Sequence, residues 1–147
     1  MGVYDYVPRL LKESGAELLV TKLRIKPGKP FVFARWPDEP PRYVFGLPGN
    51  PVSSYVCTLR FAPRLIARMT GGSPTDPLRS ATLASPLPGN GPREFYQPAT
   101  ISDGNATPLH WKSSADLFTL AAADVLIVRP ENDPPQSPGA TVRVMEL

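Results

Sequence analysis

The 147-residue sequence is poor in the residues that build disulfides and zinc sites, because it has one cysteine, Cys57, and one histidine, His110. A single cysteine excludes an intrachain disulfide, and the pair supplies too few ligands for a conventional Cys/His zinc site. The cytosol is therefore the expected compartment.

Long apolar runs and blocks of like charge are also absent. No segment approaches the roughly 20 apolar residues of a membrane helix, and the first residues lack the basic-then-apolar order of a signal peptide. The 16 Lys and Arg residues are scattered among 13 Asp and Glu, for a net charge of +3. We expect a soluble protein without a membrane or nucleic-acid partner and with a mild preference for anionic ligands.

Proline is abundant, with 20 residues spread between apolar segments, which is typical of a loop-rich globular chain. In the first half, the pattern predicts a helix over 4–15 and strands over 16–25, 31–34 and 43–47. A longer helix is predicted from Pro51, with Asn50 as N-cap, to a stop at Gly71 and Gly72. Its predicted apolar face contains Val52, Tyr55, Val56, Leu59, Ala62, Ile66 and Met69.

From residue 74 the composition changes to short runs with strand character, separated by Pro, Gly, Asn and Asp turns. One helical turn or two is predicted within 114–122. We expect an α/β unit over 1–73 and a small all-β domain over 74–147.

The segment "VFGLPGNPVSSYV", residues 44–56, is predicted to run from a strand through a tight turn into a capped helix. Such a turn aims free backbone N–H groups and the positive end of the helix dipole at one spot, which favours an anion. A capped turn without any ligand explains the same pattern, and the segment alone does not separate the two interpretations.

The loop "KPGKP" places Lys26 and Lys29 on a proline-restricted segment, which suits a phosphate or another oxyanion. Two solvated lysines at a turn are the alternative. Both loops are expected at the same ends of neighbouring strands in an α/β layer, where ligands bind beyond the carboxyl ends. Taken together, they favour a shared anion site.

Further candidates lie outside these two loops. Asp5 is either a charge near a helix start or a ligand for Mg²⁺ beside a phosphate. Arg93, Ser113 and Ser114 are oxyanion candidates in the β domain, with a surface arginine and an ordinary turn as the alternative. Cys57 is expected to be a buried, inert thiol. Trp36 and Trp111 are expected to be packing residues.

The segments "YDYVPRLLKESGAELLVTKLRIKPGKPFVFARW", "VFGLPGNPVSSYV" and "RMTG" together closely resemble the C-terminal half of the MoeA/gephyrin E-domain family. The tail "WKSSADLFTLAAADVLIVRPENDPPQSPGATVRVMEL" looks like the C-terminal β domain of that family. The resemblance runs in order over nearly the whole chain, and "KPGKP" followed by "GLPGNPVS" is its most specific part.

The resemblance implies a molybdopterin molybdenumtransferase, which inserts molybdate into adenylylated molybdopterin and releases AMP with the help of Mg²⁺. It implies that residues 1–73 are part of a three-layer, MogA-like molybdopterin-binding domain and that residues 74–147 are barrel-like. By motif position, Asp5 matches a metal-binding and catalytic acid, and Lys26 and Lys29 match catalytic, oxyanion-binding lysines. The matching ligand-binding residues are Pro48, Gly49, Asn50, Pro51, Ser53, Arg93, Ser113 and Ser114.

In the family, a turn of the type "GGVSVGD" and further domains precede the acidic segment, whereas here only Gly2 and Val3 of that turn are present. We therefore expect a fragment, a truncated reading frame, or a subunit completed by a homodimer partner or by an N-terminal portion. The alternative function is a non-catalytic molybdopterin-binding or oxyanion-binding scaffold that needs such a partner.

Overall fold

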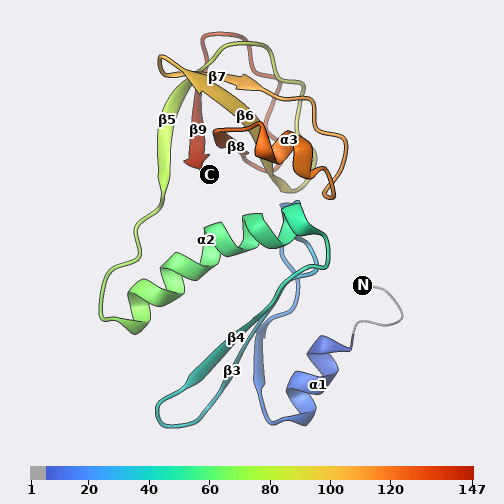
Figure 1. Ribbon diagram of the computed structural model, residues 1–147, viewed down its shortest axis with the longest axis vertical. Helices are drawn as coiled ribbons and strands as arrows, with labels where there is room; N and C mark the ends of the chain where they lie inside the picture. Colours follow the sequence, from blue (N-terminus) through green and yellow to red (C-terminus); the bar gives the residue numbers. More distant parts are fainter. Residues whose placement is uncertain (1–5) are drawn as a thin grey trace.

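The computed structural model describes residues 6–147, so the predicted metal ligand Asp5 lies outside the described residues. A small helix-flanked sheet lies at one end of the molecule and a β-barrel at the other, with a long helix running between them (Figure 1). This arrangement decides where the predicted site residues lie.

The first sheet has three antiparallel strands in the order β1-β3-β4, which are Glu17–Val20, Val32–Trp36 and Arg42–Gly46. Helix α1, Val7–Glu13, packs near it, since a Cβ on Gly46 would lie 3.0 Å from Cγ1 of Val7. The predicted strand over 16–25 divides in two, because the chain leaves this sheet after β1 and forms β2, Ile25–Lys26, in the barrel's sheet.

Helix α2, Pro51–Met69, begins and ends where predicted, and it continues through Pro63. Its predicted apolar face is only partly buried. Val52 and Val56 are buried, whereas Tyr55, Ile66 and Met69 remain 40%, 59% and 60% exposed. The reason is tertiary: the barrel lies over the N-terminal part of α2, and the C-terminal part extends beyond it (Figure 1).

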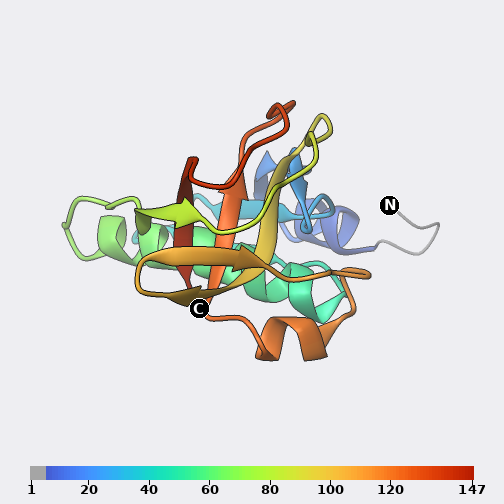
Figure 2. The same cartoon turned by 90° about the horizontal axis from the view of Figure 1, so that it is seen from above.

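The all-β, barrel-like half is confirmed. Its strands are β5 (Leu78–Leu83), β6 (Glu94–Ser102), β7 (Asn105–Pro108), β8 (Val125–Arg129) and β9 (Thr141–Glu146). They pair in the order β6-β7-β5-β9-β8, and β8 pairs back onto β6, so the five strands form a closed ring (Figure 2). Closure removes the exposed strand edges of an open sheet. The interior is filled by Ala81, Leu83, Leu87, Ala99, Ala106, Val125, Ile127, Val142 and Val144.

A second apolar cluster joins the two halves of the chain. It combines Ile25, Phe31, Val52, Val56 and Cys57 of the first half with Tyr96, Leu120, Leu126, Val128 and Met145 of the second. In addition, β2 pairs in parallel with β6, although it precedes residue 74. The two halves therefore share a core, and the division into 1–73 and 74–147 remains a prediction.

The two ligand loops lie close together as expected, but the expected reason was wrong, because they do not follow neighbouring parallel strands of an α/β layer. The turn between β3 and β4 makes an antiparallel hairpin, with Val32 opposite Gly46. The start of β3 therefore lies beside the end of β4, and this brings "KPGKP" next to "GLPGN". A MogA-like, three-layer domain is not evident from this antiparallel sheet of residues 17–46.

Candidate functional site

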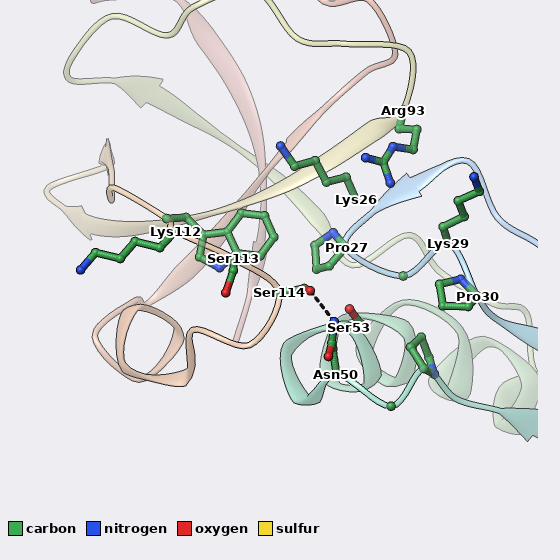
Figure 3. A pocket seen from close by; sticks show the side chains of 14 residues that line it. Lys26, Pro27, Lys29, Pro30, Asn50, Ser53, Arg93, Lys112, Ser113 and Ser114 are labelled. Atoms are coloured by element: carbon green, nitrogen blue, oxygen red, sulfur yellow. Dashed lines mark hydrogen bonds between the residues drawn. The ribbon is translucent and has the colours of Figure 1, made fainter. Parts of the chain in front are cut away.

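A cavity of about 410 Å³ lies between the barrel and the helix-flanked sheet (Figure 3). Three segments line it: the loop from β2 to β3, the turn from β4 into α2, and the barrel loops that carry Arg93 and residues 111–114. The cavity brings together nine predicted site residues, namely Lys26, Lys29, Pro48, Gly49, Asn50, Ser53, Arg93, Ser113 and Ser114. Pro51 is not among its lining residues.

The charge of the cavity wall is of one sign. Lys26, Lys29, Arg93 and Lys112 line it, and none of the lining residues is acidic. Within residues 6–147, none of these four cations forms a salt bridge with a carboxylate. A concave surface lined by positive charge attracts anions.

The "KPGKP" loop owes its shape to Gly28, whose φ of 128° is rarely adopted by residues with a side chain. A Cβ at this position would lie 2.6 Å from Cδ1 of Ile25 and 2.8 Å from Sγ of Cys57. The amides of Leu23 and Phe31 both donate to the Lys29 carbonyl, at 3.1 and 3.0 Å. The loop is therefore packed against the core, and both lysine side chains start from a fixed backbone.

The turn into α2 presents the start of a 19-residue helix to the cavity. The Ser54 amide donates to the Asn50 carbonyl, so the N–H groups of Val52 and Ser53 precede the first intrahelical bond. The Ser54 hydroxyl donates to the Pro48 carbonyl. Free N–H groups and the helix dipole add to the positive potential of this wall.

Asn50 has the backbone position of an N-cap, as predicted, but its side chain makes no capping bond. Its Nδ2 instead donates to Oγ of Ser114 at 2.7 Å, across the cavity wall (Figure 3). Asn50, which the sequence predicted to be a helix cap, thus links α2 to the barrel loop that carries Ser114.

The loop that carries Ser113 and Ser114 is held by Asp116, the N-cap of α3, Leu117–Ala121. The Asp116 carboxylate accepts from the Thr119 amide at 3.1 Å and from the Lys112 amide at 3.4 Å. Hydrogen bonds from the backbone and side chain of Thr119 lower the pKa of Asp116, so the carboxylate stays charged.

Hydrogen bonds from Asn90 and Arg129 hold the loop that carries Arg93. Asn90 Nδ2 donates to the carbonyls of Arg93 and Pro130, at 2.8 and 2.6 Å. Arg129, only 3% exposed, pairs with Asp133 and also donates to the Pro88 carbonyl at 2.6 Å. These bonds join residues 88–93 to residues 129–133, and the network therefore fixes the backbone at Arg93.

Sequence reasoning missed the roles of Trp111 and Lys112 in lining the cavity. Trp111 stacks on Phe95, with ring centroids 5.5 Å apart, and its buried Nε1 has no acceptor within residues 6–147. Lys112 directly precedes Ser113 and Ser114, and this adjacency was the available signal. Its side chain points away from Lys26 and Arg93 (Figure 3).

Neither a metal cluster nor a membrane span is found in the described part of the chain. Residues 6–147 contain no group of three or more His, Cys, Asp or Glu side chains placed to hold a metal ion. No helix in this range has the length and apolar character needed to cross a bilayer. Cys57 is buried as predicted, and burial raises its pKa to about 12.

The barrel, the helix start and the basic cavity together define a small α+β protein with a pocket suited to oxyanions. Residues 80–147 match the model of the family described as MoeA C-terminal region (domain IV), which confirms the resemblance found in the sequence.

Similarity to single proteins extends beyond that region. A molybdopterin molybdenumtransferase of Nostoc sp. (strain PCC 7120 / SAG 25.82 / UTEX 2576) is 31% identical over 156 residues, covering 100% of this chain and 35% of the relative. The molybdenum cofactor synthesis protein cinnamon of Drosophila melanogaster is 44% identical over 62 residues, which are 42% of this chain and 10% of that protein.

Solved structures show the same fold. The crystal structure of the molybdopterin biosynthesis moeA protein from Pyrococcus horikoshii OT3 matches with a TM-score of 0.71 and 26% identity, over 88% of this chain and 32% of that one. The chain thus spans about a third of the length of the curated relatives that match it throughout.

Proposed function

We propose that this chain supplies the oxyanion-binding half of a molybdopterin molybdenumtransferase site. The observation that carries the proposal is the cavity in which Lys26, Lys29 and Arg93 meet the start of α2 without any acidic lining residue. Its volume of about 410 Å³ is within the usual range of small-molecule sites.

In the proposed reaction, molybdate is inserted into the dithiolene of adenylylated molybdopterin, and AMP is released. Lys26, Lys29 and Arg93 bind and orient anionic oxygens of molybdate or of the ligand's phosphates. The N–H groups of Val52 and Ser53 reinforce this binding from the helix start. Hydroxyls of Ser53 and Ser113 offer further hydrogen bonds to the same oxygens.

Magnesium is part of the proposal only through Asp5. Mg²⁺ is held by carboxylates and phosphate oxygens, and the described lining of the cavity is basic, amide- or hydroxyl-bearing, or apolar, without a carboxylate. These lining residues therefore do not suit a resident Mg²⁺, and no binding step depends on it here.

The remaining part of the site is proposed to come from outside the described residues. On this view residues 1–73 belong to a three-layer, MogA-like domain that a homodimer partner or an N-terminal portion completes, and the protein works in the cytosol.

The lining of the cavity, which offers cations and hydroxyls but no carboxylate, also favours a second candidate, a scaffold that binds molybdopterin or an oxyanion without turnover. The two candidates agree on binding and differ only in chemistry. Release of AMP therefore distinguishes them.

The test measures molybdate affinity by calorimetry, and then AMP release from adenylylated molybdopterin with molybdate and Mg²⁺. We expect Lys29→Met to weaken molybdate binding at least about tenfold, since it removes a cation from the cavity wall. Lys12→Met is the matched control, because Lys12 lies on α1 and does not line the cavity. Equal affinities of the two variants would refute the proposal. Binding without AMP release would support the scaffold candidate.

A further inference from the structure

Lys26 differs from most cations of this protein in its partners. Its Nζ lies 4.6 Å from the ring centroid of Phe95 and 5.9 Å from that of Trp111. The two rings stack at an interplanar angle of 29°. Among residues 6–147, no carboxylate forms a salt bridge with this ammonium.

Strand pairing places Phe95 beside Lys26. In the parallel pairing of β2 with β6, Lys26 lies opposite Phe95, and the Phe95 ring faces the lysine ammonium. Trp111 comes from the loop that also carries Ser113 and Ser114. The position of Nζ thus depends on the barrel strand and on the serine loop together.

Aromatic partners differ from a carboxylate in one respect that matters for anion binding. A ring face attracts an ammonium through its quadrupole but carries no net charge, so the lysine keeps its full charge. A carboxylate would hold the side chain equally well and would cancel that charge. An unrestrained lysine, in contrast, loses rotamer entropy when it binds an anion.

We propose that Phe95 and Trp111 are positioning residues that hold the Lys26 ammonium ready for an oxyanion ligand. The inference rests on the proposed function, because it concerns the same cavity. It predicts that loss of either ring weakens anion binding only through Lys26, without direct contact between the ring and the anion.

The experiment measures the molybdate dissociation constant of the full chain for Trp111→Leu, Trp111→Phe and Phe95→Leu, and each variant is checked for folding by thermal unfolding. We expect Trp111→Leu and Phe95→Leu to weaken binding by about 2- to 5-fold, which is the range of one exposed cation–π contact. Trp111→Phe keeps a ring and should stay near wild type.

A matched control is available elsewhere in the chain. Trp36 lies 5.0 Å from the guanidinium carbon of Arg42 and does not line the cavity. Trp36→Leu removes a comparable cation–π contact and should leave the affinity for molybdate unchanged.

A double-mutant cycle tests whether the ring acts through the lysine. In a Lys26→Met background, Trp111→Leu should have no further effect on the molybdate dissociation constant. In addition, the NMR signals of the Lys26 ε-methylene protons should carry a ring-current shift that shrinks in Trp111→Leu and Phe95→Leu. A merely structural role of the rings would not produce these two results together.

The possible failures are distinguishable. If the wild-type chain does not bind molybdate, or Lys29→Met binds as tightly as wild type, the proposed function is wrong. If the wild type binds, Lys29→Met is weaker, and Trp111→Leu binds like the wild type, only the positioning role is refuted. An undiminished effect of Trp111→Leu in the Lys26→Met background also refutes it.

Discussion

Gly28 offers the sharpest test of how the lysine loop is built. Gly28→Ala places a Cβ 2.6 Å from Cδ1 of Ile25 and 2.8 Å from Sγ of Cys57, at a φ of 128°. Overpacking a core contact costs about 1–3 kcal/mol, and an unfavourable positive φ adds about 1–2 kcal/mol. We therefore expect the free energy of unfolding to fall by about 2–5 kcal/mol.

Urea denaturation followed by circular dichroism measures this loss. With a slope of about 2 kcal/mol per molar urea, the midpoint should fall by about 1–2.5 M. Because Lys26 and Lys29 flank the glycine, molybdate binding should weaken as well. Gly49→Ala is the matched control in the same cavity, since a Cβ there would meet no atom within 4 Å.

A double variant tests whether the steric contact with Cys57 causes part of the loss of stability in Gly28→Ala. Removing Sγ in a Gly28→Ala/Cys57→Ala double variant relieves one of the two contacts, so the pair should cost less than the sum of the single changes. A midpoint of Gly28→Ala within about 0.2 M of that of Gly49→Ala would refute the steric argument.

Two further predictions concern Asn50 and Cys57. Asn50→Ala and Ser114→Ala should each lower the free energy of unfolding by about 0.5–1.5 kcal/mol, and the double variant by no more than the larger single loss, because both remove one hydrogen bond. Fully additive losses in urea denaturation would contradict this link. Burial raises the pKa of Cys57 from 9.0 to about 12, so the stability that the buried thiol contributes is complete below pH 9 and is lost between pH 9 and 12. The free energy of unfolding of the wild type, measured by urea denaturation, should fall more steeply over this range than that of Cys57→Ala, by up to about 1.4 kcal/mol per pH unit, and parallel curves would disprove the assignment.

Much of the local structure was predictable because its causes are local. The extended backbone of Asn50 and the fixed φ of Pro51 start α2. The hydroxyl of Thr70, which donates to the Ile66 carbonyl, and the positive φ of Gly71 end it. The hairpin of β3 and β4 and the short α3 follow from proline punctuation and from the capping carboxylate of Asp116.

The side of α2 that is buried was less predictable. Helical spacing places Ile66 and Met69 on the face of Val52 and Val56, but spacing does not say how far a neighbouring element extends. The barrel covers only the first part of the helix, and so the pattern overestimated burial.

The sequence by itself determined the residue types of the site and the loops that carry them. Lys26, Lys29 and Asn50 follow from proline-restricted turns and helix capping, which are properties of short segments. Only the tertiary structure decided that Arg93, Ser113 and Ser114 face these loops, and that Phe95 and Trp111 flank Lys26. Those relations depend on the pairing of β2 with β6 and on closure of the barrel, which join segments far apart in the chain and leave no periodic signal in the sequence.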